Sequence, residues 1–192
     1  MNASSKNRLF DRFADWLIFR ALERRPDFVI GGADDPYMLR WWLTPWSAYA
    51  RGVDDADKTW WQWLVTRLPG IYLHFIVRSD DDRALHDHPW MNCSIVLRGG
   101  YIEHTIDAGG IHRLRERKPG DIVFRRARSA HRLEVKQDID EHTGHVVNIP
   151  CWSLFICGFR VRHWGFHCPT GWVHWRQFTS PDDRGAIGRG CQ

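Results

Sequence analysis

The sequence predicts an all-β fold, an antiparallel sandwich or barrel that carries an N-terminal helix and a tryptophan-rich helical insertion. From Gly70 onward, short runs rich in β-branched and aromatic residues follow one another at spacings of about 8–12 residues, which is typical of all-β domains. Turn residues such as Gly99-Gly100 and Pro119-Gly120 separate these runs. The chain has 192 residues, of which 43% are hydrophobic, so it can bury one core and is not a disordered chain.

Residues 4–25 are predicted to form an amphipathic helix. Apolar residues recur at three- and four-residue spacing from Leu9 to Ala21, and Pro26 ends the pattern. The polar face mixes both signs of charge, so we expect the helix to pack on the domain rather than to lie on a membrane.

The next segment contains one strand and one short helix. Residues 37–43 are predicted to be a strand, and residues 58–68 a helix within a long connection. Trp60, Trp61 and Trp63 lie in this helix with few basic neighbours, so we expect a packed lid or a subunit contact rather than a platform for nucleic acid bases.

The predicted strands of the β-rich part follow in order. The Gly99-Gly100 pair predicts a hairpin turn, because glycine reaches positive φ without strain. In the stretch from His131 to Val135, His131 shares a face with Leu133 and Val135, so its ring is expected to point into the core. The predicted runs span residues 71–78, 85–89, 93–97, 101–106, 111–117, 121–126, 131–135, 146–149 and 152–161. We divide the chain into residues 1–69 packed on the barrel, a barrel over 70–178, and a flexible tail over 179–192.

Charge and composition exclude several partners. With 27 Lys+Arg against 23 Asp+Glu the chain is only mildly basic, and it carries no groove-reading helix or aromatic RNA motif, so we expect no nucleic acid partner. No apolar run is long enough to span a membrane. The five cysteines form no CxxC pair and no signal-peptide pattern precedes them, so we interpret them as reduced thiols of a cytoplasmic protein.

The stretch His86-Asp87-His88 carries the strongest chemical signal. On a strand, residues i and i+2 share a face, so both imidazoles can reach one metal ion at about 2.0–2.1 Å. The inward-facing His131 is the natural third ligand from a neighbouring strand. The sequence therefore predicts a metal site made of His86, His88 and His131.

This arrangement resembles the cupins over about residues 70–165. The first cupin motif, G(x)5HxH(x)3–4E(x)6G, is matched by His86, His88 and Gly99, with Asn92 in place of the glutamate and Asp80 in place of the first glycine. The second motif, G(x)5PxG(x)2H(x)3N, is matched by Gly120 and His131, whereas Arg126, Arg128 and Val135 replace its proline, glycine and asparagine. The resemblance implies a jelly-roll barrel, also called a double-stranded β-helix, with a metal at its mouth. It also implies a homodimer, because cupins commonly pair through sheet edges.

The missing glutamate favours a three-histidine site with open positions. Iron(II) is the expected ion, and zinc, nickel or manganese are the alternatives. Its charge stays uncompensated, so we expect a small anionic substrate, either a carboxylate or a thiolate. Arg78, Arg98 and Arg126 are candidates to bind the far end of the substrate. Asn92 is expected to orient the ligand, and Trp90 to exclude water together with Trp152 and Trp164.

The spacing His86-x-His88-x4-Cys93 is also similar to that of the thiol dioxygenases of the cysteine dioxygenase type. This similarity implies a catalytic role for Cys93, although no tyrosine follows Tyr101 to form the crosslink known in some of those enzymes. The alternative is that Cys93 is a small hydrophobic residue next to Ile95.

These observations together favour a non-haem iron dioxygenase. The alternative is a cupin without redox chemistry, either a small-molecule binding or sensory module or a metal-dependent isomerase. A second group of possible ligands, His163, His167, Cys168 and His174, matches no zinc spacing, so we expect these residues to belong to an aromatic wall over one barrel end.

Overall fold

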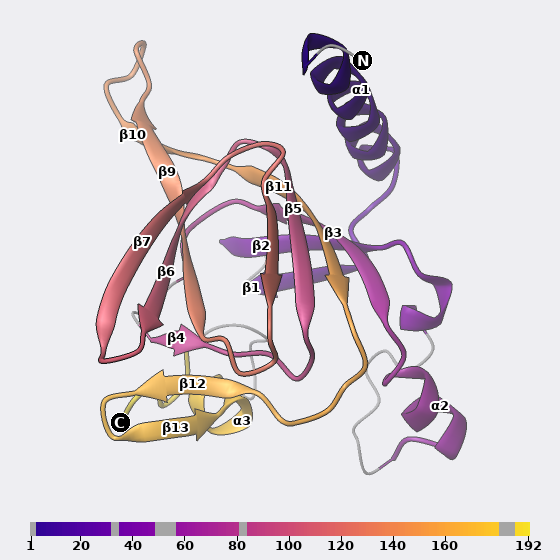
Figure 1. Ribbon diagram of the computed structural model, residues 1–192, viewed down its shortest axis with the longest axis vertical. Helices are drawn as coiled ribbons and strands as arrows, with labels where there is room; N and C mark the ends of the chain where they lie inside the picture. Colours follow the sequence, from indigo (N-terminus) through magenta and orange to yellow (C-terminus); the bar gives the residue numbers. More distant parts are fainter. Residues whose placement is uncertain (1–2, 32–34, 49–56, 81–83, 181–186) are drawn as a thin grey trace.

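Two antiparallel sheets face each other in the computed structural model, which describes residues 3–31, 35–48, 57–80, 84–180 and 187–192 (Figure 1). The first sheet, in spatial order, contains β1 (Phe28–Gly31), β2 (Pro36–Trp42), β3 (Gly70–Ile76), β11 (Cys151–Cys157), β5 (Asn92–Arg98) and β8 (Ile122–Arg125). The second contains β13 (Gly171–His174), β12 (Gly165–Cys168), β4 (Leu85–His86), β9 (His131–Ile139), β6 (Tyr101–Asp107) and β7 (Ile111–Arg117). Strand β10 (Val146–Ile149) pairs with β9 alone and forms a projecting hairpin with it.

The order of the central strands is that of a jelly roll. The four strands β3-β11-β5-β8 face β4-β9-β6-β7. From β3 to β9, consecutive strands lie in different sheets, except that β6 and β7 pair within the second sheet. The early strand β3 lies beside the late strand β11, which closes the double Greek key. The predicted all-β jelly roll is therefore confirmed. Strands β1-β2 extend the first sheet beyond β3, and β12-β13 extend the second sheet beyond β4.

Helix α1 (Ala3–Leu22) packs against the outer face of the first sheet, as its periodicity predicts. Ala14, Leu17 and Ala21 are buried on the sheet in a cluster that includes Leu73 and Trp152. No helix in the described residues has the length and apolar content needed to cross a bilayer.

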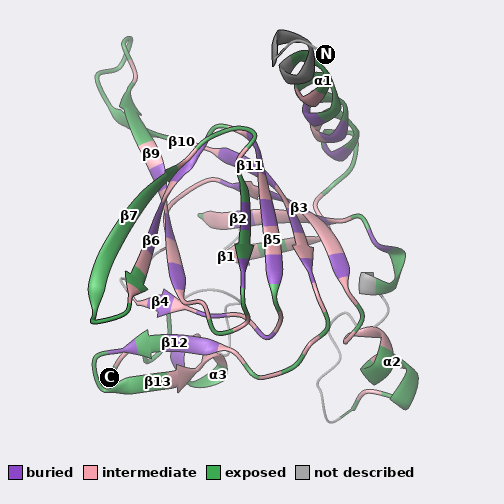
Figure 2. Ribbon diagram, viewed as in Figure 1, coloured by how far each residue is buried: buried purple, intermediate pink, exposed green. Residues whose placement is uncertain are grey.

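A second cluster fills the space between the sheets. It consists of Met38, Ile76, Val96, Tyr101, Leu133, Val135 and Cys151. Along the inner face of β9, Val135 and Leu133 belong to this cluster, and His131 comes next towards β4. The apolar core therefore ends at His131, next to β4. Figure 2 shows buried segments along the strands of the barrel and β4 at one end of it.

Two local predictions were wrong. Gly99 does have a positive φ of 72°, and a Cβ there would lie 2.2 Å from the carbonyl oxygen of Pro150. However, β5 and β6 belong to different sheets, so Gly99-Gly100 makes a corner between sheets and not a hairpin. Helix α2 (Trp60–Val65) has no buried residue, so its exposed tryptophans do not pack as a lid, whereas the alternative, a subunit contact, stays a prediction.

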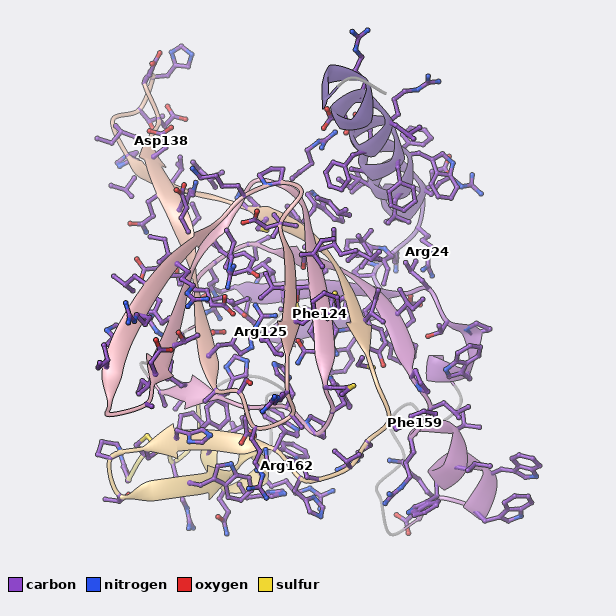
Figure 3. The ribbon with its side chains drawn as sticks, viewed as in Figure 1. Arg24, Phe124, Arg125, Asp138, Phe159 and Arg162 are labelled. Atoms are coloured by element: carbon purple, nitrogen blue, oxygen red, sulfur yellow. A yellow bond between two sulfur atoms is a disulfide. The ribbon has the colours of Figure 1, made fainter. Side chains whose placement is uncertain are left out.

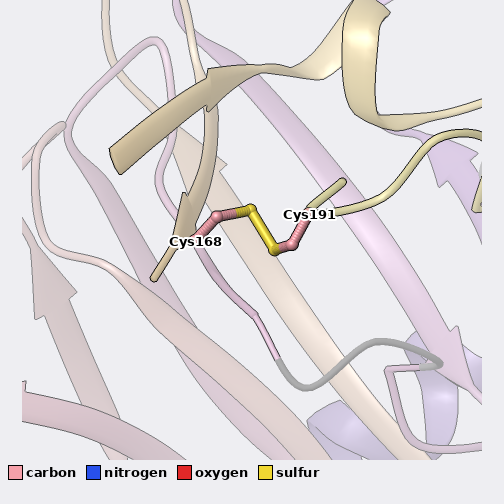
Figure 4. Close-up of a disulfide and its surroundings, with 2 residues drawn as sticks. All are labelled: Cys168 and Cys191. Carbon is pink, nitrogen blue, oxygen red and sulfur yellow. A yellow bond between two sulfur atoms is a disulfide. The ribbon is translucent and has the colours of Figure 1, made fainter. Parts of the chain in front are cut away.

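The prediction of five reduced thiols is also wrong. Cys168 of β12 and Cys191 form a disulfide, and Cys93, Cys151 and Cys157 remain free (Figure 4). An isolated β-bridge between Thr179 and Ile187 adds to this attachment. The remaining regular elements are the short helix α3 (Trp175–Phe178) and, earlier in the chain, the 3-10 turn η1 (Pro45–Ala48). The described end of the chain is thus tied to the barrel, whereas residues 181–186 lie outside the described part.

Replacing Leu73 with alanine tests the packing of α1 on the sheet. Leu73 is fully buried, so Leu73→Ala is expected to lower the free energy of unfolding by about 2–5 kcal/mol. Leu9→Ala, at a helix position that is 65% exposed, should change it by less than about 0.5 kcal/mol. Urea unfolding followed by circular dichroism measures both values, and equal losses would contradict the packing.

A thiol titration tests the disulfide. Protein denatured without reductant is expected to show three reactive thiols, and five after reduction. Five thiols before reduction would show that Cys168 and Cys191 are not bonded.

Candidate metal centre

The three predicted histidines converge at the polar end of the barrel. His86 of β4 and His131 of β9 are direct partners in the sheet. Strand β4 ends at His86, so His88 is not on the strand as predicted; its backbone N–H donates to the carbonyl of Ala127. All three rings nevertheless offer a nitrogen, and these nitrogens lie within 4.8 Å of one another.

The spacing of the rings suits a shared cation. Nε2 of His88 lies 2.9 Å from Nε2 of His131. Two nitrogens that each bind a metal at about 2.1 Å, at a right angle, are about 3.0 Å apart. Without a cation, one ring would donate its N–H to the other; with a cation, both present lone pairs.

The imidazoles are held in the neutral form that binds metals. Burial, followed by the charge of Arg125, lowers the pKa of His131 to about 3. Burial and the neighbouring His131 lower the pKa of His88 well below its usual value. For His86, burial also lowers the pKa, although Asp80 opposes the shift. Neutral rings keep their lone pairs free for a metal ion.

A carboxylate lies behind two of the rings. Asp80 Oδ2 is 3.8 Å from Nδ1 of His86, and Glu103 Oε1 is 3.4 Å from Nδ1 of His131. At these distances the carboxylates attract the Nδ1 sides of the two rings without a formed hydrogen bond, which leaves the Nε2 sides for a ligand. Neither residue stood out in the sequence as part of the site.

Glu103 is enclosed by two arginines. Arg125 Nε donates to its Oε1 at 2.6 Å, and Arg117 Nε donates to its Oε2 at 2.7 Å. Burial alone would raise the pKa of Glu103, but the contact with His131 and the charge of Arg125 lower it, so the side chain stays ionised. Glu103 shares a strand face with Tyr101, and this alternation is the signal by which the sequence could have indicated an inward carboxylate.

Arg125 connects this pair to Asn92. It lies between the two sheets (Figure 3), and its Nη1 donates to Ser94 and, at 3.4 Å, to Oδ1 of Asn92. Asn92 is only 4% exposed, and its Nδ2 has no partner among the described residues. Asn92 thus replaces a ligand carboxylate with an N–H donor that a bound ligand can use.

Asp87 lies between the two histidines in sequence, but its side chain points away from them, towards the β12-β13 hairpin. It is buried and accepts hydrogen bonds from Gly165 N and Trp172 Nε1 of the β12-β13 hairpin, while Arg162 Nη1 lies 2.6 Å from its Oδ2 (Figure 3). His167 Nε2 also lies 3.2 Å from this carboxylate. Asp87 therefore fixes the backbone that carries the two ligands.

Aromatic and basic residues form the opposite wall. The ring of Phe155 lies 5.8 Å from that of His88 and 5.0 Å from that of His74. Arg40 Nε donates to Nε2 of His74 at 2.9 Å, and the Arg40 charge also contributes to the lowered pKa of His88. The ring of Trp164 lies 6.4 Å from that of His86.

The arginines predicted as substrate contacts lie elsewhere. Arg98 binds Asp11 and Asp15 of α1 at 2.9 and 2.7 Å. Arg78 lies beside Asp35, at 3.2 Å, and Arg126 is exposed. Arg40, Arg117 and Arg125 reach the site because each occupies an inward position of its strand. Arg78 and Arg126 instead follow the ends of β3 and β8, and a register shift precedes Arg98 on β5.

Cys93, Trp152 and Trp90 were also predicted to belong to the site, but none of them is placed beside the three histidines. Cys93 lies on β5 with Ile95 and Leu97, on the face opposite Asn92, so it does not join the histidines. Trp152 packs under α1 against Trp41, whereas Trp90 is half-buried with its Nε1 unpartnered among the described residues.

The second group of possible ligands does not form a metal cluster in the described residues. The rings of His163 and His174 lie 5.3 Å apart, Cys168 is in the disulfide and His167 contacts Asp87. These residues therefore belong to the wall at the barrel end, as predicted.

A cavity of about 490 Å³ adjoins the centre, bounded mainly by β6, β7, β8 and β9. Glu103 and His131 lie at its inner end, and the exposed Arg115 and Arg128 line it as well. The centre thus has an approach from solvent along the arginine-bearing strands.

Comparisons with known proteins find distantly similar structures and no similar sequence. No protein-family model and no curated protein sequence matches the chain. Among solved structures it is similar to a cupin-like protein from Thermotoga maritima, with 15% identity, a TM-score of 0.43, and 80% of this chain covering 91% of that one. It is also similar to the DMSP lyase DddQ from Ruegeria pomeroyi, with 17% identity, a TM-score of 0.35, and 50% of this chain covering 41% of the lyase. A variant of oxalate decarboxylase from Bacillus subtilis gives 16% identity, a TM-score of 0.43, and 82% of this chain covering 32% of that chain.

The chain therefore spans less than half of the lyase and about a third of the decarboxylase. At these low scores the fold assignment depends on the strand order of the chain itself. That order and the three converging histidines define a cupin-like jelly roll with a candidate metal centre.

Removing one ligand tests the centre. His131→Ala is expected to retain less than about a tenth of the wild-type metal after dialysis, because two imidazoles bind a divalent ion much more weakly than three. His142→Ala, in the exposed β9-β10 turn, should retain metal like the wild type. Metal content by elemental analysis is the measurement, and equal content in wild type and His131→Ala would show that the ligand set is wrong.

Proposed function

We propose that this protein is a metal-dependent enzyme of the non-haem iron type, a dioxygenase that acts on a small anionic substrate. The observation that supports the proposal is a set of three neutral imidazoles with no carboxylate among them, placed next to buried arginines.

The charge balance favours an anionic substrate. Three neutral ligands leave the full +2 charge of a divalent ion, whereas Glu103 is already shared by Arg117 and Arg125. Arg40 adds another positive charge on the opposite wall. A carboxylate or thiolate that enters this region compensates charge in a site of low dielectric, where the attraction is strong.

Each residue around the centre has a defined task in this proposal. Nδ2 of Asn92 donates to the substrate and orients it. Phe155 and Trp164 exclude water from the histidines. Asp87 holds the ligand-bearing segment in place, and Glu103 orients His131. Iron(II), when bound, would supply electrons to dioxygen and a Lewis acid for the acidic group of the substrate.

Imidazole also suits zinc and nickel, so the metal distinguishes this proposal from a cupin without redox chemistry. Three protein ligands leave open positions for both a substrate and dioxygen, as in other iron oxygenase sites. We therefore propose iron.

Oxygen consumption tests the proposed reaction. Protein loaded anaerobically with iron(II), zinc or nickel is mixed with a panel of small carboxylates and thiols in an oxygen electrode. The expected result is uptake of dioxygen with the iron form only and with at least one member of the panel. Iron-loaded protein that consumes no dioxygen across the panel, or zinc-loaded protein that converts a panel member without it, would contradict the dioxygenase.

Two neighbouring residues on β5 refine this test. Asn92→Ala is expected to lower kcat/KM about tenfold or more, because a buried donor to the substrate is lost. Cys93→Ala is the matched control on the opposite face and should leave kcat/KM unchanged. A loss in Cys93→Ala would support the thiol dioxygenase arrangement instead.

A further inference from the structure

The cavity beside the metal centre has an arginine-rich wall that the proposed chemistry does not use. Its volume of about 490 Å³ lies within the range of small-molecule sites, roughly 300–1,000 Å³. Arg115, Arg117, Arg125 and Arg128 all line it. None of these four arginines was predicted from the sequence to contact a ligand.

Sheet register places the arginines of β7 on the face that lines the cavity. Because side chains alternate along a strand, Arg113, Arg115 and Arg117 share one face of β7. Arg117 binds the buried Glu103, so this is the inner face. Arg115 stands directly opposite Glu103 in the β6-β7 pairing.

The lining carries an excess of positive charge. Four arginines face two carboxylates, Glu103 and Asp107, which leaves two positive charges. Glu103 is shared by Arg117 and Arg125, and Asp107 accepts from Arg113, whose side chain is outside the lining. Arg115 and Arg128 have no acidic partner among the described residues, so they are the free cations of the cavity.

Of the three predicted ligands, His131 lines this cavity, whereas His86 and His88 do not belong to its lining. His131 lines its inner end, and Thr105, also in the lining, is the sheet partner of His131. Leu85 and Val123 add apolar surface between the arginines and the histidine. A ligand that fits has a short uncharged body with an acidic group at the arginine end.

We infer that this cavity binds a small organic anion with two acidic groups, one held by Arg115 and Arg128 and the other directed at the metal centre. That this anion is the substrate rests on the proposed function. The substrate would then be a dicarboxylate or a phosphorylated acid.

Titration calorimetry tests the inference with defined probes. Malonate, succinate, glutarate and inorganic phosphate are titrated into metal-loaded and metal-free protein. Arg115→Gln and Arg128→Gln are each expected to weaken binding about tenfold, because each removes a charge-assisted hydrogen bond. Bridging to the metal predicts that one dicarboxylate binds about tenfold more tightly to the metal-loaded wild type, and that this probe loses affinity in both variants.

A matched control lies next to Arg125 in sequence. Arg126→Gln removes an exposed arginine that is outside the cavity lining. It should bind the probes within about twofold of the wild type. Melting temperatures of all variants confirm that the fold is intact.

The outcomes separate the two proposals. Wild-type protein that binds none of the probes, or equal binding in wild type, Arg115→Gln and Arg128→Gln, would overturn the inference. Arginine-dependent binding in a protein that fails to take up metal would support the pocket and refute the proposed function. Tighter binding of phosphate than of any dicarboxylate would assign the arginine end to a phosphate group, and the reverse order would assign it to a carboxylate.

Discussion

The ion pair between Glu103 and Arg125 joins the two sheets and determines what the rest of the site can be. Glu103 comes from β6 of one sheet and Arg125 from β8 of the other, and both are almost fully buried. Removal of one partner from such a pair leaves an uncompensated buried charge, which costs about 3–5 kcal/mol. Because Glu103 also faces Nδ1 of His131, the same contact that holds the sheets together fixes the orientation of a metal ligand.

The barrel is divided into two ends by this arrangement. One end is an apolar core in which Val135 and Leu133 pack, and the other contains the histidines, Asn92 and the arginines. The boundary between the two ends crosses individual strands: on the inner face of β9, the polar His131 and the apolar Leu133 are adjacent positions. Rigid strands thus carry nearly every group of the centre, and Asp87 attaches the one ligand segment that leaves its strand.

The sequence predicted the parts of this protein that depend on local pattern. Strand alternation placed His131 inward, helical periodicity identified α1, and the repeated short runs indicated the jelly roll. It failed where a partner comes from far along the chain. Asn92 and Cys93 are neighbours with opposite orientations, and only the pairing of β5 with β8 shows that Asn92 meets Arg125. The bond between Cys168 and Cys191 likewise depends on tertiary proximity, which cysteine spacing does not reveal.

The strict alternation on β7 makes the length of the β6-β7 turn a determinant of the whole arginine wall. The turn contains Gly109 and Gly110, whose Cβ positions face open space. Insertion or deletion of a single residue there would slip the register and turn His112, Leu114 and Glu116 inward in place of the three arginines. The carboxylate of Glu116 would then lie on the same inner side as that of Glu103, and the two negative charges would repel each other. A change of two residues would restore the original faces. Natural variants of this loop should therefore differ in length by even numbers.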